Sequence, residues 1–525
     1  MQEIDNHFEI VFLMRQSRTA KSIKNSFVAT LFYFFNLILQ FCSRKIFIDC
    51  LGTEILGLNT TAMNLLQFLN LAELGIGGAV AFSLFKPIQE QDNNTVNKII
   101  ALQGFLYRRI ALMIIIGALI LMCFFPLIFK KINLPLWYTY ASFITLLFSA
   151  LLGYFVNYKQ VLLSASQQDY KIHYSYKSIM MIKILCQSLA VYFFHNGYVW
   201  WLILEIIFAI IASWTLNIVI VKSFPNLGKV KESIKSLKSE YKELVVKIKQ
   251  LFFHKIGYFV LSQTSPLIIY AYVSLSMVTI YGNYLMIVNG VTQLINAVFN
   301  SFGAAVGNLV AEGDDQKIRV VFKELFSLRF VIVITLCFQT YYITTDFITL
   351  WIGAKYVLPN SILIIITLTL FISLFRFTID AFTNAYGLFQ DIYAPIVEAV
   401  LNLGLSIILG YFYSLKGILV GVFISQIIIV GCWKPYFLFT RKMNGMAKTY
   451  IWLYIKHLFC ASIAWFFTIL IMNSINWDIE YPIIRIISKI ILSTVIFLSL
   501  LCIPLISLKS GLDLFYKRII HRIHY

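Results

Sequence analysis

The sequence predicts an all-α protein that crosses a lipid bilayer about fourteen times. It contains about fourteen separate apolar segments of membrane-spanning length, and several of them carry no charged residue at all. Hydrophobic residues make up 60% of the 525 residues, charged residues only 13%, and the mean hydropathy is +0.81. The segments are too long and too continuous for the alternating strands of a membrane barrel. We therefore expect helices, which satisfy their backbone hydrogen bonds internally.

The expected helices follow one another along the chain. The first half contains six spans, at residues 25–47, 58–85, 110–129, 138–163, 175–194 and 200–221. The second half contains eight, at residues 254–273, 278–310, 328–350, 358–382, 393–414, 417–440, 451–473 and 484–508. We expect four parts: an N-terminal lobe over 1–221, a linker over 222–255, a C-terminal lobe over 256–440, and two extra helices with a basic tail over 441–525.

The linker between the two predicted lobes is rich in lysine. Its lysines interleave with apolar residues at helical spacing, among them Ile234, Leu237, Leu244 and Ile248. We expect an amphipathic helix on the cytoplasmic leaflet, where each lysine near anionic headgroups contributes about 1 kcal/mol. A solvated linker helix is the alternative interpretation.

Basic residues are concentrated in alternate connections between the spans. The formal net charge is +19, a value also found in nucleic-acid-binding proteins, but here its distribution is more informative than its size. The N-terminal segment, the linker and the C-terminal tail belong to one basic set of connections. The opposite set holds little beyond Lys130, Lys131, Lys355 and Lys416. This asymmetry predicts cytoplasmic termini and no nucleic-acid partner.

The two halves share a weak internal repeat. Gly57 and Asn64 lie 225 residues before Gly282 and Asn289, in the second span of each half. Because six spans is an even number, both halves enter the membrane from the same side. We expect two pseudo-symmetric six-helix lobes with a cavity between them.

Polar side chains form a stripe on each of two expected helices. Residues three or four positions apart lie on one helix face, so a polar group must lie opposite each stripe. Substrate contact is one interpretation, and hydrogen bonding between helices is the other. The stripes are Asn36, Gln40 and Arg44 in the first span, and Asn289, Gln293 and Asn296 in the eighth.

Charged residues inside the spans are the strongest functional signal. A membrane-buried cation costs at least about 2.5 kcal/mol. Lys159 and Lys183 have no acid within one helical turn, whereas Arg376 is followed four residues later by Asp380. The excess of cations in the first lobe suits a phosphate or diphosphate, and structural pairing is the alternative. The buried acids that offer H⁺ or Na⁺ sites, or balance those cations, are Glu73, Glu205, Asp380 and Glu398.

The sequence gives no indication of an enzyme. It contains no HExxH, GxSxG or Walker motif and no metal-spaced cluster, and its eight cysteines are scattered singly. The outward connections are only a few residues long and leave no room for an active site. We expect no catalytic activity, no metal and no cofactor.

One segment carries a more specific pattern. Residues 51–87 read LGTEILGLNTTAMNLLQFLNLAELGIGGAVAFSLFKP and follow an SRK motif at Ser43 to Lys45. The LGTE-x-LGLN, LAELGIGGA and SLFKP runs resemble the second-span region of Wzx-type bacterial polysaccharide-export flippases. These belong to the multidrug/oligosaccharidyl-lipid/polysaccharide (MOP) exporter superfamily. The TTAM stretch at 60–63 departs from the glycine and aromatic residues expected there. This difference affects how the helix packs at that point and not the resemblance as a whole.

The resemblance implies two six-helix lobes and two extra helices in the bacterial cytoplasmic (inner) membrane. It implies that a polyprenyl-diphosphate-linked oligosaccharide crosses by alternating access for surface polysaccharide biosynthesis. Implied partners are membrane lipids, a polysaccharide polymerase and glycosyltransferases. We expect Arg44, Lys159 and Lys183 to bind the diphosphate, and Arg376 to complete the site from the other lobe. Lys183→Ala should then stall export without unfolding the protein.

Two other functions are compatible with the same architecture. A cation-coupled multidrug antiporter of that superfamily would favour an acidic cavity, which the cation excess argues against. A membrane assembly protein without transport would leave the buried cations without a substrate.

Overall fold

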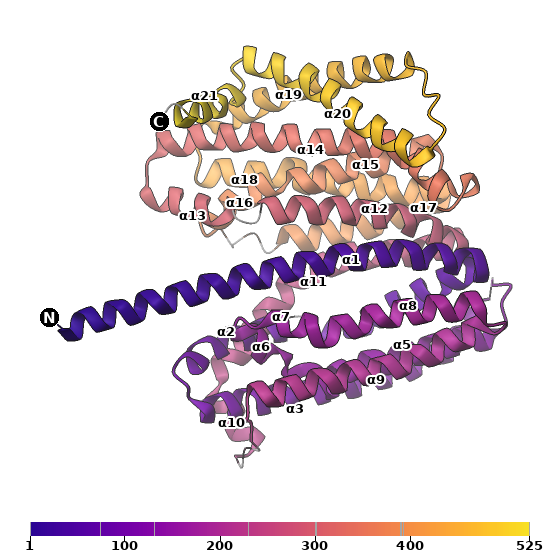
Figure 1. The fold of residues 1–525 in the computed structure, drawn as a ribbon, viewed down its shortest axis with the longest axis vertical. Helices are drawn as coiled ribbons and strands as arrows, with labels where there is room; N and C mark the ends of the chain where they lie inside the picture. Colours follow the sequence, from indigo (N-terminus) through magenta and orange to yellow (C-terminus); the bar gives the residue numbers. More distant parts are fainter. Residues whose placement is uncertain are drawn as a thin grey trace. The chain divides into compact units, whose positions relative to one another are not determined.

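The computed structural model describes residues 2–73, 75–130, 132–228, 230, 232–299, 302–388, 391 and 393–523. Within these ranges every regular element is a helix (Figure 1). The chain forms two compact units. Unit 1 comprises residues 1–270 and 274–279, and unit 2 comprises residues 271–273 and 280–525.

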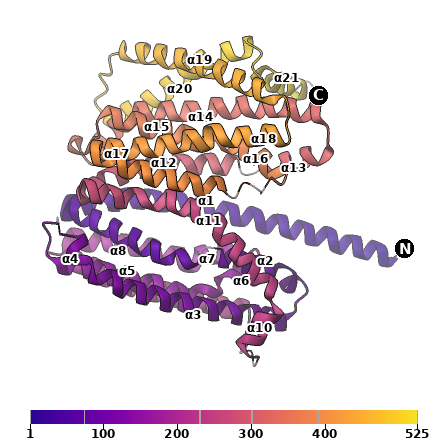
Figure 2. The same cartoon turned by 180° about the vertical axis from the view of Figure 1, so that it is seen from behind.

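Unit 1 is a bundle of long helices with short helical turns at their ends. Helices α3, α5 and α8 run side by side in both views (Figures 1 and 2), and α8 and α5 each pack against α9. The elements are α1 (Gln2–Leu69), η1 (Asn70–Glu73), α2 (Ile76–Gln89), α3 (Asn93–Cys123), α4 (Phe125–Ile128), α5 (Leu136–Phe155), η2 (Asn157–Gln160), α6 (Val161–Ala165), α7 (Asp169–Ile172), η3 (His173–Lys177), α8 (Ser178–Phe193), α9 (Gly197–Ser223), α10 (Ile234–Glu240) and α11 (Lys242–Tyr272).

Helix α1 is two limbs that meet at a reversal. Gly52 has φ 82° and ψ 171°, a left-handed backbone that favours glycine. Before the reversal Asn25 donates to the carbonyl of Gln167, beyond the end of α5. After it the chain runs back along α5, because Glu54 accepts from the backbone of Asn133 ahead of α5 and Asn59 accepts from Ser142 inside it. The two limbs therefore correspond to the first two predicted spans, with a one-residue turn between them.

The predicted linker begins as a segment docked on unit 1. Asn97 near the start of α3 bonds the backbone of Asn226 and Gly228, at 3.0 and 3.2 Å. The neighbouring Lys98 ammonium lies 3.1 Å from the carboxylates of both Glu232 and Glu240. Helix α10 thus packs on α3, and α11 then runs on from Lys242. The predicted four-part division, including a membrane-surface helix over 222–255, stays a prediction.

Unit 2 contains the remaining helices, and α12 starts at the unit boundary. Its elements are α12 (Leu275–Phe299), α13 (Phe302–Glu312), α14 (Asp315–Trp351), η4 (Ala354–Tyr356), α15 (Asn360–Phe375), α16 (Phe377–Ala385), α17 (Tyr393–Gln426), η5 (Ile427–Trp433), α18 (Lys434–Arg441), α19 (Met446–Asn473), α20 (Pro482–Ser507) and α21 (Leu512–Ile523).

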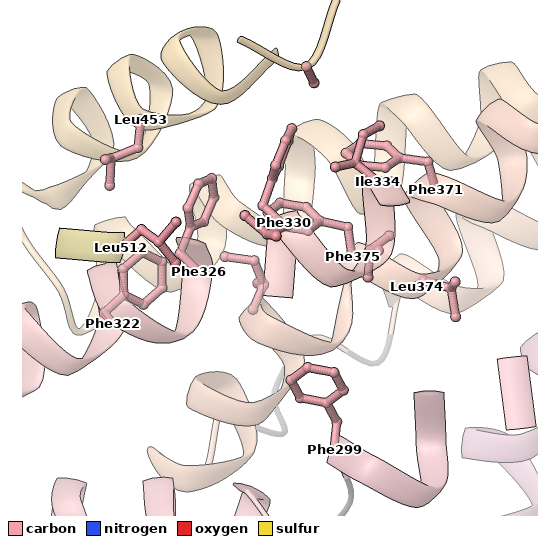
Figure 3. Close-up of a cluster of buried hydrophobic side chains, with 14 of the residues drawn as sticks. Phe299, Phe322, Phe326, Phe330, Ile334, Phe371, Leu374, Phe375, Leu453 and Leu512 are labelled. Carbon is pink, nitrogen blue, oxygen red and sulfur yellow. The ribbon is translucent and has the colours of Figure 1, made fainter. Parts of the chain in front are cut away.

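The core of unit 2 is built on aromatic rings of α14. Phe322, Phe326 and Phe330 recur every four residues, so they line one face of the helix and are fully buried. Figure 3 shows this row beside Phe371 and Phe375 of α15. Ring pairs at centroid distances of 5.0–5.7 Å, mostly edge to face, connect the two helices. This packing holds unit 2 together where lipid weakens the hydrophobic drive for helix association.

A second single-residue reversal lies inside α17. Ser414 has φ 50° and ψ −136°, and the limbs on either side contact one another. Ser406 donates to the carbonyl of Ile418, and Asn402 donates to Ser425. The eleventh and twelfth predicted spans are therefore the two limbs of α17, the second continued by η5 and α18.

All fourteen predicted spans coincide with helices over most of their described length. In the part of the chain that the structure describes, eight helices are long and apolar enough to cross a membrane, the first being Lys24–Leu69 with both limbs of α1. Helices α8, α12 and α14 are not among the eight. Each carries a buried polar side chain: a lysine in α8, an amide in α12 and an arginine in α14. The all-helical, multi-pass membrane fold predicted from the sequence is confirmed.

Candidate functional site

Among the described residues of unit 1, the most enclosed ionic group is the pair formed by Lys183 on α8 and Glu205 on α9. The Lys183 ammonium lies 2.8 Å from Glu205 Oε1, and the two residues are 9% and 5% exposed. Gln187, one turn after Lys183, donates to the other carboxylate oxygen at 3.0 Å. Ser149 of α5 adds a longer contact of 3.4 Å to Oε1. Both charges are thus neutralised within the bundle, which is the structural alternative stated for these residues above.

Arg44, on the first limb of α1, binds a backbone group. Its guanidinium donates to the carbonyl oxygen of Thr279 at 3.0 Å, and the Thr279 hydroxyl donates to the carbonyl of Thr53 at 2.7 Å. These contacts attach the start of α12 to both sides of the Gly52 reversal.

Asn36 and Gln40 precede Arg44 on the same stripe. Asn36 is half-buried and Gln40 is exposed. Lys159 lies in η2, at the break between α5 and α6, and is half-buried with its ammonium 5.9 Å from the Tyr158 ring centroid. Within the described residues no carboxylate lies within ion-pair distance of Lys159. The structure does not bring Lys159 into contact with Arg44 or Lys183.

Glu73 ends the short helix η1 and lies among tyrosines. The Tyr107 hydroxyl donates to Glu73 Oε1 at 3.0 Å, and the Tyr107 and Tyr154 rings lie 5.6 Å apart. Asn70 precedes Glu73 by three residues, so the two side chains are eclipsed on the 3₁₀ turn. Among the described residues Glu73 has no basic partner within ion-pair distance, which leaves it as an acid that accepts from a phenol.

In unit 2 the predicted pair Arg376 and Asp380 exists, and it has a third member. Arg376 Nε lies 3.0 Å from Asp380 Oδ2, while Lys434 of α18 lies 2.7 Å from Oδ1. Both carboxylate oxygens of Asp380 therefore accept from cations. Glu398 of α17 is 2% exposed, and its Oε1 has no hydrogen-bond partner in the described part of the chain.

The polar stripe on α12 is divided between surface and interior. Asn289 and Gln293 are exposed, whereas Asn296, one turn further on, is half-buried and borders a cavity that Asp380 also lines. The structure thus brings Asn296 and Asp380 to one cavity, and Arg376, Asp380 and Lys434 to one cluster.

Two residues of this region were missed at the sequence level. Lys434 lies 54 positions after Asp380, beyond any local pattern. Arg329 is the second residue of the predicted ninth span, where no role was predicted for it, yet it is only 6% exposed inside unit 2. The apolar run that follows Arg329, FVIVITL, could have indicated that the helix is already inside the bundle there.

Comparisons with solved structures find similar folds. No protein-family model matches the chain, and no curated protein matches it. The fold is nevertheless similar to that of solved membrane transporters. An inward-facing multidrug resistance MATE family transporter of the MOP superfamily superposes with a TM-score of 0.57 at 11% identity, covering 78% of this chain and 96% of its own.

A lipid-transporting structure matches more of the chain. The lipid II flippase MurJ, in an inward closed conformation, superposes with a TM-score of 0.63 at 16% identity. The superposition covers 94% of this chain and 99% of that structure. The multidrug transporter leaves about a fifth of this chain unmatched, although it is itself almost fully covered. At these identities the comparisons establish the fold and not the substrate.

Proposed function

We propose that this protein is a flippase for a polyprenyl-diphosphate-linked oligosaccharide. The observation that carries the proposal is the extent of the fold match. A structure described as a lipid II flippase accounts for 94% of the chain, against 78% for the multidrug transporter. The resemblance of residues 51–87 to polysaccharide-export flippases supports the same substrate class. No enzymatic step is proposed.

The charges support an anionic rather than a cationic substrate. Among the predicted acids, Glu205 and Asp380 are each bound by cations, so they are not available to attract a cationic drug. Lys159 has no carboxylate partner in the described part of unit 1, and the half-buried Arg44 guanidinium lies beside the Thr279 carbonyl. We assign diphosphate contact to Arg44 and Lys159, and we assign Lys183 to holding α8 and α9 together through Glu205.

The transport cycle proposed is alternating access by movement of the two units. The substrate lipid would be taken at the cytoplasmic leaflet of the bacterial inner membrane and released at the outer one. The polar side chains Asn36, Gln40, Asn289 and Gln293 would contact sugars. Glycosyltransferases would act before this step, and a polymerase would act after it. Glu73 and Glu398 are the acids proposed to take up H⁺ or Na⁺, since neither has a basic partner within ion-pair distance among the described residues.

Depletion of the protein in its host tests this function. If the proposal is right, lipid-linked oligosaccharide accumulates on the inner leaflet, where it stays inaccessible to a sugar-modifying enzyme added outside. Complementation with Lys159→Gln should restore little export, whereas Lys45→Gln should restore it fully. Lys45 is a suitable control because its exposed side chain pairs with Asp49 on the same helix.

The multidrug alternative predicts a different result. In that case depletion leaves the lipid-linked oligosaccharide pool unchanged and increases sensitivity to cationic drugs. That combination would replace the flippase assignment.

A further inference from the structure

Unit 2 contains a cavity of about 240 Å³ lined by four helices. It is lined by Asn296 of α12, Gly303 of α13, Arg329 of α14, and Thr378 and Asp380 of α16. Gly303 faces open space, since a Cβ added there would meet nothing within 4 Å. The cavity is about eight times the 30 Å³ that one water molecule occupies in the liquid, which is room for a diphosphate group.

Arg329 is the cation in the described lining of this cavity, and it is 94% buried. Its Nε donates to the carbonyl oxygen of Leu374 at 3.1 Å. Its guanidinium carbon lies 4.4 Å from the Phe299 ring centroid and 4.9 Å from that of Phe377. Contact with aromatic rings leaves the N–H groups at the edge of the guanidinium plane to bind acceptors. One terminal nitrogen, Nη2, is buried and has no hydrogen-bond partner among the described residues.

A break in a membrane helix explains why arginine is held there. Helix α15 ends at Phe375 and α16 begins at Phe377, so the carbonyl of Leu374 is available to the Arg329 Nε. Broken helices of this kind are tolerated in membranes where the freed backbone lines a polar site. The contact fixes the guanidinium against the cavity wall.

Two further polar groups of the same lining lack partners in the described structure. They are the Thr378 hydroxyl and the Asn296 side-chain oxygen. A hydroxyl can donate to an anion, and an amide can present its NH₂ by rotation about its last torsion angle. Three side chains from three helices thus converge on one cavity with unused hydrogen-bonding capacity.

Asp380 does not neutralise Arg329 by direct contact. Its two carboxylate oxygens accept from Arg376 and from Lys434. The cavity lining as described contains one cation, Arg329, and one carboxylate, Asp380, and that carboxylate already binds two cations outside the lining. Guanidinium groups bind phosphate oxygens in a bidentate manner, which suits Arg329 to an anionic ligand.

We propose that this cavity binds a phosphate or diphosphate group through Arg329, with Thr378 and Asn296 as further donors. The inference rests on the proposed function for its biological ligand, the diphosphate of a lipid-linked substrate. It adds a binding site inside unit 2 that is separate from Arg44 and Lys159 in unit 1. A free phosphate from solution has the same chemistry, and the test distinguishes the two sources.

Binding to the full-length protein in lipid nanodiscs tests the proposal. The probes are farnesyl diphosphate, inorganic pyrophosphate, and farnesol, which lacks the phosphates, each titrated by calorimetry. Arg329→Gln should weaken one diphosphate-binding component at least tenfold. The control is Arg319→Gln on the same helix, because Arg319 is half-buried, bonds the Asn444 carbonyl and does not line the cavity. The control should bind as the unmodified protein does.

Thr378→Val gives a second measurement that does not remove a charge. It keeps the side-chain shape, so folding should be preserved, and it should weaken the same component at least threefold. Farnesol binding should be equal in all variants. Equal affinity for pyrophosphate and farnesyl diphosphate would identify a free anion as ligand, and binding of farnesyl diphosphate alone would identify a lipid headgroup.

The proposal is overturned if no diphosphate binds, or if Arg329→Gln and Thr378→Val both bind as well as the unmodified protein. If Lys159→Gln abolishes binding while Arg329→Gln does not, the site in unit 2 is wrong and the proposed function stands. If neither variant alters binding and depletion leaves lipid-linked oligosaccharide unchanged, the proposed function fails as well.

Discussion

The ion pair between Lys183 and Glu205 allows a prediction that separates a structural from a substrate-binding lysine. Replacing Lys183 by methionine removes the ammonium but keeps most of the volume. Glu205, whose side chain is only 7% exposed, would then be a buried carboxylate without its counter-ion. Removing one partner of a buried pair costs about 3–5 kcal/mol. We therefore expect Lys183→Met to lower the free energy of unfolding by about that amount.

The double variant Lys183→Met with Glu205→Gln should recover most of the lost stability. In this variant neither charge remains, and Gln187 and Ser149 can still bond a neutral amide. The coupling between the two sites is measured by chemical unfolding in detergent micelles, with both single variants and the double variant forming a cycle. Lys159→Met is the matched control, because it removes a half-buried lysine of the same unit without breaking an ion pair.

Two results would contradict the structural assignment. One is that Lys183→Met unfolds at the same denaturant concentration as the unmodified protein while export stops. That outcome corresponds to the expectation from the sequence alone, in which the lysine serves the substrate. The other is that the double variant is no more stable than Lys183→Met, which would mean that Glu205 is not the group left unpaired.

Three further predictions concern close contacts and buried acids. Gly57→Ala should prevent correct packing of α1, because its Cβ would lie 2.0 Å from the carbonyl oxygen of Leu275. The yield of folded protein on size exclusion should therefore drop. Gly153→Ala is the control and should not change the yield, because a Cβ there meets no atom within 4 Å. Asp380→Asn leaves two cations without their shared carboxylate and should lower the unfolding free energy by about 1–3 kcal/mol, with the midpoint of chemical unfolding as the measurement. Glu398→Gln removes a buried charge without breaking an ion pair, so the free energy of unfolding should be unchanged, while any dependence of export on an H⁺ or Na⁺ gradient should be lost. If export depends on the gradient as before, Glu398 has no coupling role.

Local patterns in the sequence predicted most of the helical fold. Spanning length and lack of charge located the fourteen helical segments, since these properties depend on each segment alone. The reversals at Gly52 and Ser414 were anticipated only as boundaries between spans. Ser414 in particular has no turn-forming neighbour to predict a one-residue reversal, and its backbone is set by the packing of the two limbs of α17.

The site could be predicted only where partners are close in sequence. Arg376 and Asp380 are four residues apart, so helical geometry alone predicts their contact. Glu205 was recognised as one of several acids that could neutralise Lys183, but a separation of 22 residues on another helix left the choice open. Arg329 was missed because its burial comes from Phe299 and Phe377, which lie 30 and 48 residues away in the sequence.

The one-residue turn at Gly52 has a consequence for how the protein enters the membrane during synthesis. The two limbs of α1 have no loop of their own between them, so they must be inserted together as a helical hairpin rather than one after the other. The hydrogen bonds from Ser142 and Tyr198 to Asn59 on the returning limb can form only after α5 and α9 have followed. Until then this buried amide remains without those partners in lipid, so assembly of unit 1 depends on helices made more than eighty residues later.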